Sequence, residues 1–163
     1  MRKRIQLTAN IYLDEFTHSD TAVRHGISIA IEPGSQHFEN CKRLAKNILQ
    51  PARDHFDKPV IISSGYRPKE LNRLIRGSQT SAHKDALAVD WNVLGVQPVD
   101  VCEWLLTQPG ISFDQLILEY NRWVHTGIKI DPSQHREQVL TAQHVLQPTG
   151  KPKTQYVSGL IKE

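Results

Sequence analysis

His83 and Asp90 are the residues of this sequence whose types and spacing most directly suggest metal chemistry. They lie in the run Ser81-Ala82-His83-Lys84-Asp85-Ala86-Leu87-Ala88-Val89-Asp90, which supplies an imidazole and a carboxylate within a short length of chain. Both groups are common zinc ligands, and catalytic zinc usually has three protein ligands and keeps a fourth position for water. The pair therefore predicts a hydrolytic zinc centre that needs one further ligand.

His125 is the best third ligand among the eight histidines. Residues 115–119 and 123–130 have the apolar, β-branched composition of two strands, and a short polar turn joins them. That turn places Glu119 opposite Trp123, so Glu119 and His125 share one face of the hairpin. A carboxylate close to a metal but not bound to it can accept a proton from the attacking water and donate it to a leaving amine. Glu119 is therefore the candidate general base.

Arg67 follows a predicted strand at residues 60–64 and would lie at the rim of the same site. Its planar guanidinium suits a substrate carboxylate or carbonyl. These residues also have structural interpretations, because an isolated His and Asp are more often structural or exposed than ligating. Glu119 could form an exposed ion pair with Arg122 or Lys129, and Arg67 could cap a helix terminus.

The apolar pattern predicts the elements that would hold these residues in place. Apolar side chains at intervals of three and four residues indicate helices, and β-branched or alternating runs indicate strands. Asp90 would point away from the more apolar face of its strand, and Pro51 would kink or interrupt the longest helix. Helices are expected at residues 20–24, 35–49 with a further turn to 56, 68–76 and 98–108, and strands at 60–64, 86–93, 115–119, 123–130, 138–143 and 155–157.

Composition and charge limit the classes of protein that this chain can be. The 163 residues, 39% of them hydrophobic, suit one domain over residues 1–163. The formal net charge of +3 comes from scattered basic residues, so we expect no nucleic-acid partner. No apolar run is long enough to span a bilayer, so we expect no membrane partner. Cys41 and Cys102 lack a Cys-x-x-Cys spacing and are expected to be buried free thiols.

Three short motifs occur in an order that is typical of a known family. They are Ser81-Ala82-His83, Ala86-Leu87-Ala88-Val89-Asp90 and Trp123-Val124-His125, and the stretches 15–22, 49–53 and 62–67 extend the likeness upstream. In this order the sequence resembles the zinc D-alanyl-D-alanine carboxypeptidase family, and within it the phage and prophage branch. The likeness covers most of residues 1–130.

The resemblance implies a cofactor, a fold and roles for individual residues. The cofactor is Zn2+, and the fold is α+β, with helices packed on a small antiparallel sheet that carries the zinc site, as in lysostaphin-type endopeptidases and the hedgehog signalling domain. The residues that correspond to the family's zinc ligands are His83, Asp90 and His125. Glu119 corresponds to its general base, and Arg67 with Ser81 to groups that hold the terminal carboxylate of the substrate.

Two positions depart from the usual pattern of the family. Ala86 stands where relatives usually have glycine before Ala-x-Asp, and alanine is unstrained there only if its φ is negative. Arg122 stands three residues before the last histidine, where many relatives have the catalytic Glu. The base must then be Glu119, six residues before His125, a spacing that hedgehog domains and some phage-type relatives also show.

The function implied is that of a zinc metallopeptidase that hydrolyses bacterial peptidoglycan stem peptides in the manner of a bacteriophage lysis enzyme. The scissile bond stays open between D-Ala-D-Ala in a carboxypeptidase and L-Ala-D-Glu or a cross-bridge in an endolysin-type endopeptidase. The alternative is a non-catalytic, zinc-stabilised peptidoglycan-binding or virion structural module. Because the basic residues 2–4 lead into polar ones and not into an apolar signal core, we expect a protein made in the cytoplasm without a signal peptide, acting on the cell wall or periplasm after release. We also expect a monomer.

Overall fold

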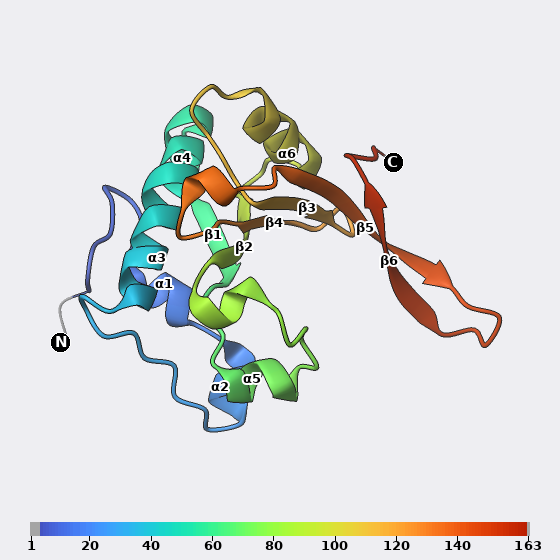
Figure 1. Ribbon diagram of the computed structural model, residues 1–163, viewed down its shortest axis with the longest axis horizontal. Helices are drawn as coiled ribbons and strands as arrows, with labels where there is room; N and C mark the ends of the chain where they lie inside the picture. The colour runs from blue at the N-terminus through green and yellow to red at the C-terminus, as the bar shows by residue number, and fades with distance from the viewer. Residues whose placement is uncertain (1–3, 163) are drawn as a thin grey trace.

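A six-stranded sheet is the framework that positions the site (Figure 1). The computed structural model describes residues 4–162. Its strands are β1 Val60–Ser64, β2 Ala88–Val93, β3 Gln115–Glu119, β4 Trp123–Gly127, β5 Gln138–Leu146 and β6 Pro152–Ser158. They are ordered β1-β2-β4-β3-β5-β6, and neighbours are antiparallel except β3 and β5, which are parallel. The α+β class is confirmed. The sheet was expected to be antiparallel throughout, but it is mixed, because β3 and β5 are parallel.

The parallel pair follows from the path of the chain after β4. Gly127 at the end of β4 lies opposite Gln115 at the start of β3. The connection, which includes the short helix η3 Pro132–Gln134, stays at that end of the sheet and delivers Gln138 beside Gln115. A strand that starts beside the start of its neighbour must run in the same direction. The residue pattern of a strand does not report this, since the direction depends on the connection.

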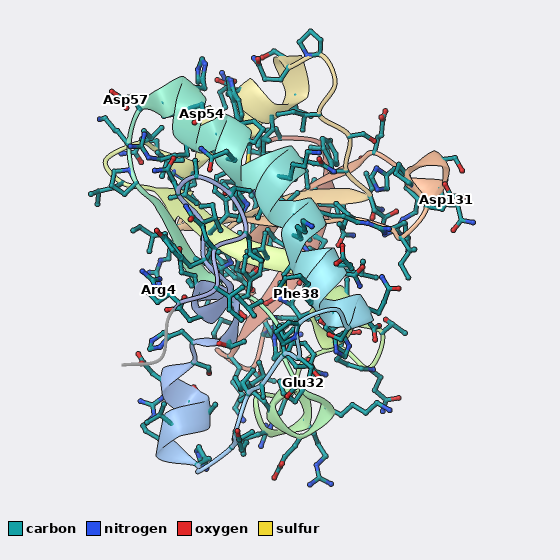
Figure 2. The ribbon with its side chains drawn as sticks, turned by 90° about the vertical axis from the view of Figure 1, so that its left-hand side faces the viewer. Arg4, Glu32, Phe38, Asp54, Asp57 and Asp131 are labelled. Carbon is teal, nitrogen blue, oxygen red and sulfur yellow. The ribbon has the colours of Figure 1, made fainter. Side chains whose placement is uncertain are left out.

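One long helix runs across the sheet, from Phe38 near one end to Asp54 near the other (Figure 2). It consists of α3 Gln36–Leu44, the π-helical segment η1 Ala45–Leu49 and α4 Gln50–Phe56. Pro51 has no N–H to donate and its ring crowds the preceding turn, and a wider π turn directly before it relieves that conflict. The predicted interruption is therefore a π segment and not a break. The buried face of the helix consists of Cys41, Leu44, Ala45, Ile48, Leu49 and Ala52.

This long helix and α6 Pro98–Thr107 cover the same face of the sheet, since Trp104 of α6 stacks on His55 of α4. The side chains that the sheet buries beneath them alternate along its strands and include Val89, Trp91, Val93, Leu116, Leu118 and Val124. The indole N–H of Trp91 donates to the Thr126 hydroxyl over 3.1 Å, which satisfies two polar groups within this core. The opposite face of the strands is left for Asp90, Glu119 and His125.

The two cysteines lie in the helical layer, and both are buried and free, as predicted. Burial raises the pKa of the Cys41 thiol and of the Cys102 thiol to about 12. In Cys102 the neighbouring charge of Glu103 adds to the effect. Both residues therefore act as small apolar side chains.

The remaining helices are short. They are α1 Leu13–Thr17, α2 Asp20–Arg24, α5 Lys69–Leu74 and the 3-10 helix η2 Ala82–Asp85. Of these, α1 contacts β1 and η2 contacts β2. Ser19 caps α2, because its hydroxyl accepts from the backbone N–H of Ala22 over 3.2 Å. Over residues 4–162, no helix has both the length and the apolar character that crossing a bilayer requires.

The boundaries of several predicted elements shift by a few residues. The strand expected at 86–93 begins at Ala88, and the one expected at 123–130 ends at Gly127. The two strands expected in the tail form a longer hairpin, and only β6 of the two is an edge strand.

Candidate metal centre

His83, Asp90 and His125 converge on one point at the open face of the sheet. Asp90 of β2 and His125 of β4 are direct cross-strand partners, and His83 projects from η2, the turn that leads into β2. Three atoms form a small triangle, with His83 Nε2 3.3 Å from His125 Nδ1 and 3.2 Å from Asp90 Oδ1. The third side, from His125 Nδ1 to Asp90 Oδ1, is 2.8 Å. These residues form the one group of possible metal ligands found within residues 4–162.

Two sides of the triangle have the length that a tetrahedral zinc site requires, and the third, at 2.8 Å, is a hydrogen bond between His125 and Asp90. Zinc binds nitrogen and oxygen ligands at about 2.0–2.2 Å, which puts neighbouring ligand atoms of a tetrahedron roughly 3.3 Å apart. Two imidazoles and one carboxylate are also a donor set found in zinc enzymes, and they leave a fourth position toward the cleft. An ionised carboxylate that is largely buried needs hydrogen-bond donors or a cation beside it, and a bound metal ion would supply that cation. The residues present therefore fit zinc.

The backbone around Gly65 fixes the orientation of His83. The Nδ1 atom of His83 lies 2.8 Å from the carbonyl oxygen of Gly65, so Nδ1 carries the proton and Nε2 presents its lone pair to the site. Gly65 is held in turn by the adjacent N–H of Tyr66, which donates to the Phe16 carbonyl over 2.8 Å. The N–H of Arg67 donates to the His83 carbonyl over 3.0 Å. The segment that follows β1 thus orients a candidate ligand that lies in η2.

Ala86 ends the η2 turn in the left-handed region, with φ of +54°. The negative φ that an unstrained alanine needs is therefore not present, and this explains why the family usually has glycine here. The side chain of Ala86 is fully buried in the core, which offsets part of the backbone strain. The strained turn lets His83 and Asp90 face the same point although η2 and β2 differ in direction.

Charge within the triad favours metal binding. Burial would raise the pKa of Asp90, but His83 and His125 outweigh it and hold that pKa well below the ordinary value, so Asp90 is ionised. Burial lowers the pKa of His83, although the attraction of Asp90 opposes this. An ionised carboxylate and a neutral imidazole are the protonation states that a metal requires of its ligands.

Glu119 lies on the same face as the triad, one row away from it. Ile117 pairs with His125 and Glu119 pairs with Trp123, as predicted from the hairpin register. Burial, reinforced by the negative charge of Asp90, raises the pKa of Glu119 above its ordinary value. A raised pKa makes a carboxylate a better proton acceptor and donor near neutral pH. Lys129, one of the two alternative ion-pair partners of Glu119, is instead 3.5 Å from Asp114.

Arg67 faces the triad from the side of β1. Its Nη2 atom lies 3.7 Å from Asp90 Oδ2, and its Nε atom is buried with no hydrogen-bond partner within residues 4–162. Burial lowers the pKa of Arg67, although the attraction of Asp90 opposes this. The side chain does not cap a helix. A buried N–H without an acceptor is suited to a ligand oxygen.

One cleft of about 690 Å3 contains every residue that the sequence singled out. Its lining includes Arg67, Ser81, His83, Asp90, Glu119 and His125. Comparison with models of protein families matches residues 9–127 to the family described as Peptidase M15. This chain belongs to the peptidase M15 family. The resemblance to the zinc D-alanyl-D-alanine carboxypeptidases is thereby confirmed, and a search of curated proteins finds no match.

Peptidases of the M15 family are zinc-dependent, and this member has a His-Asp-His group that could hold the ion. It is accordingly a zinc metallopeptidase by family. Residues that the sequence reasoning missed also line the cleft, among them Asp114, Lys129, Arg136 and Tyr156. Three of these four lie after residue 127, beyond the family match, where no motif marks them. Only the strand register and the chain connections bring them to the cleft.

Proposed function

We propose that this M15 family member hydrolyses peptide bonds of bacterial peptidoglycan stem peptides, with His83, Asp90 and His125 as its zinc ligands. The observation that carries the proposal is the triangle of ligand atoms at the base of a cleft that also holds Glu119 and Arg67. A buried carboxylate with a raised pKa and an unpartnered guanidinium N–H supply the two further functions that a peptidase needs.

Each of these residues has a defined part in the proposed reaction. Zinc, when bound, supplies a Lewis acid that polarises the scissile carbonyl and acidifies water. Glu119 accepts a proton from the attacking water and then donates it to the nitrogen of the leaving amine. Arg67 binds a carboxylate or carbonyl oxygen of the peptide through its Nε and Nη atoms, and Ser81, which also lines the cleft, assists it. Together they orient the scissile bond over the triad.

The extent of the cleft favours a substrate longer than a dipeptide. It reaches from Glu119 at one end of β3 to Gln115 at the other end and on to Arg136. Four residue steps along a strand cover about 13 Å. An endolysin-type endopeptidase that cuts L-Ala-D-Glu or a cross-bridge would use this length, whereas removal of a terminal D-Ala would use only part of it.

The test is digestion of purified peptidoglycan by the zinc-loaded protein, with the released fragments identified by mass spectrometry. Loss of one alanine would identify a carboxypeptidase, and cleavage inside the stem or the cross-bridge an endopeptidase. Zinc bound at one equivalent without any cleavage would contradict the proposal and favour the non-catalytic module.

The variant Glu119→Gln tests the assignment of the base. It keeps the size and shape of the side chain but cannot accept the proton, so kcat should fall by about 100-fold or more. Zinc content, measured by mass spectrometry of the metal, should stay at the wild-type level because Glu119 lies outside the triad. The control is Glu39→Gln in α3, which lies outside the cleft and should leave kcat unchanged. Wild-type turnover by Glu119→Gln would reject this role.

A further inference from the structure

The β5–β6 hairpin lies beyond the residues that match the family and extends the sheet past β3. Figure 1 shows that it projects away from the helical layer. Its position is fixed to the β3–β4 turn through Tyr120, whose hydroxyl is 2.7 Å from the Thr154 hydroxyl and whose ring stacks on His144 at 4.2 Å. The hairpin is therefore held to the part of the sheet that carries Glu119.

The strand register aligns Tyr156 with Glu119 across the hairpin. Glu119 pairs with Ala142 of β5, and Ala142 pairs with Tyr156 of β6. Paired residues project to the same face, so all three side chains lie in one row on the face of the metal triad. The outer two backbones are about 10 Å apart by the spacing of strands. Ala142 between them contributes only a methyl group, which leaves the space above it open to the two longer side chains.

Tyr156 reaches the same cleft as the triad and is one of its lining residues. Its side chain is not part of the core, because 54% of the residue surface is exposed. Partial burial raises the pKa of the Tyr156 hydroxyl, and the negative charge of Glu119 adds to this effect. The phenol consequently remains protonated at neutral pH and can donate a hydrogen bond, and its ring offers an apolar surface beside it.

We propose that Tyr156 is a substrate-binding residue that helps to determine specificity, with its hydroxyl donating to a carbonyl oxygen of the peptide on the Glu119 side of the cleft. The inference rests on the proposed peptidase function and adds a residue to it from outside the family match. A contact of this kind, away from the reacting atoms, is made in the ground state and in the transition state alike. Its loss should raise KM and leave kcat nearly unchanged.

Steady-state kinetics on a synthetic peptidoglycan stem peptide of defined sequence test the inference with three variants. Tyr156→Phe removes only the hydroxyl and should raise KM about fivefold with kcat within about twofold. Tyr156→Ala also removes the ring and should raise KM further. The matched control is Tyr12→Phe, which removes the hydroxyl of a tyrosine that precedes α1 and does not line the cleft. It should leave KM and kcat unchanged.

Binding separates failure of this inference from failure of the proposed function. Calorimetric titration of the same stem peptide into Glu119→Gln, with and without Tyr156→Phe, needs no turnover. Weaker binding by about fivefold in the double variant supports the contact even if the wild-type protein proves inactive. The inference is overturned if both proteins bind the peptide equally well. It is also overturned if the wild-type protein is active and the Tyr156→Phe variant has the same KM. If the peptide binds to neither protein, both proposals are wrong.

Discussion

At the scale of residues, one carbonyl oxygen selects the nitrogen that His83 offers to a metal. Gly65 supplies it, 2.8 Å from Nδ1, and the position of Gly65 depends on close contact with α1. A Cβ at Gly65 would lie 2.6 Å from both the Cα and the carbonyl oxygen of Phe16, which are backbone atoms that cannot rotate away. Glycine is thus required here for packing and not for an unusual φ.

Gly65→Ala should therefore reduce both stability and metal affinity. The added methyl group forces β1 and α1 apart, so the free energy of unfolding should fall by about 2 kcal/mol or more. Urea denaturation of the metal-free protein measures this, and zinc titration should show weaker binding as the carbonyl moves off His83. Gly127→Ala is the control, since its Cβ would meet other atoms only at 3.8 Å. Equal stability of the two variants would refute this account of Gly65.

Most site residues were open to prediction from the sequence because their motifs are local. His83 and Asp90 lie on one short segment, and the short turn after Glu119 fixes its face relative to His125. Tyr156 was not predictable in the same way. Its place depends on β5 entering parallel to β3, which sets a register that no nearby motif specifies.

At the scale of elements, Asp114 connects the start of β3 to the segment that leads into β5. Its carboxylate accepts from Nε and Nη2 of Arg136 over 2.9 and 2.7 Å and also from the Arg136 backbone N–H. The backbone N–H of Gln138 donates to the Asp114 carbonyl over 3.1 Å. These bonds hold the connection at the end of the sheet where β5 must begin, and they stabilise the parallel pair.

Asp114→Asn should destabilise the protein in a pH-dependent way. Burial opposes ionisation of Asp114, but the hydrogen bonds from Arg136 outweigh it and lower the pKa of that carboxyl. Because the pKa of Asp114 is lower in the folded state, its ionised form stabilises the fold at every pH above the pKa of the unfolded chain, which is near 3.8. This stabilisation is lost as the pH falls through the pKa of the folded state. The variant should be less stable at pH 7 by about 1 kcal/mol, because Arg136 is half-exposed, and the difference should shrink below pH 4.

Thermal unfolding at pH 7 and at pH 3 measures this difference. The control is Asp57→Asn, whose carboxylate is exposed and makes one ion pair with Arg53. Its effect should be below about 0.5 kcal/mol at either pH. If Asp114→Asn were less stable than the wild type by the same amount at pH 7 and at pH 3, the loss would come from the shape of the side chain and not from its charge.

Elements of regular pattern were predicted well, and the exceptions have physical causes. The apolar spacing of the long helix is confirmed, but its π segment is a local response to Pro51 that periodicity does not reveal. Strand existence is likewise confirmed at all six positions. Strand direction at β5 was missed because it is a property of the preceding connection and not of the strand.

At the scale of the whole molecule, the proposed metal site joins the η2 turn to the face of the sheet that lies opposite the helical core. His83 comes from the η2 turn, and Asp90 and His125 come from the uncovered face of two central strands. An ion held by all three would link this turn to the sheet. The core on the opposite face forms independently of that link, so we expect the metal-free protein to fold and to be less stable.

Removal of zinc with a chelator should lower Tm without unfolding the protein at room temperature. Zinc at about 1,000 times its Kd would stabilise the folded state by about 4 kcal/mol, because the unfolded chain lacks the site. Calorimetry with the chelator, and again after zinc is restored, measures the change. Magnesium should not replace zinc, since it prefers six oxygen ligands. A Tm that is the same with and without the chelator would contradict zinc binding at this site.

The state of the two thiols bears on where such an enzyme can work. With a pKa of about 12, neither Cys41 nor Cys102 forms an appreciable thiolate at neutral pH, and the thiolate is the species that attacks a disulfide. These are the only two cysteines of the sequence, and both are enclosed in the helical layer. Transfer from a reducing to an oxidising compartment would thus leave the covalent structure of the folded chain unchanged. The proposed activity on the cell wall would require such tolerance of a change in redox conditions.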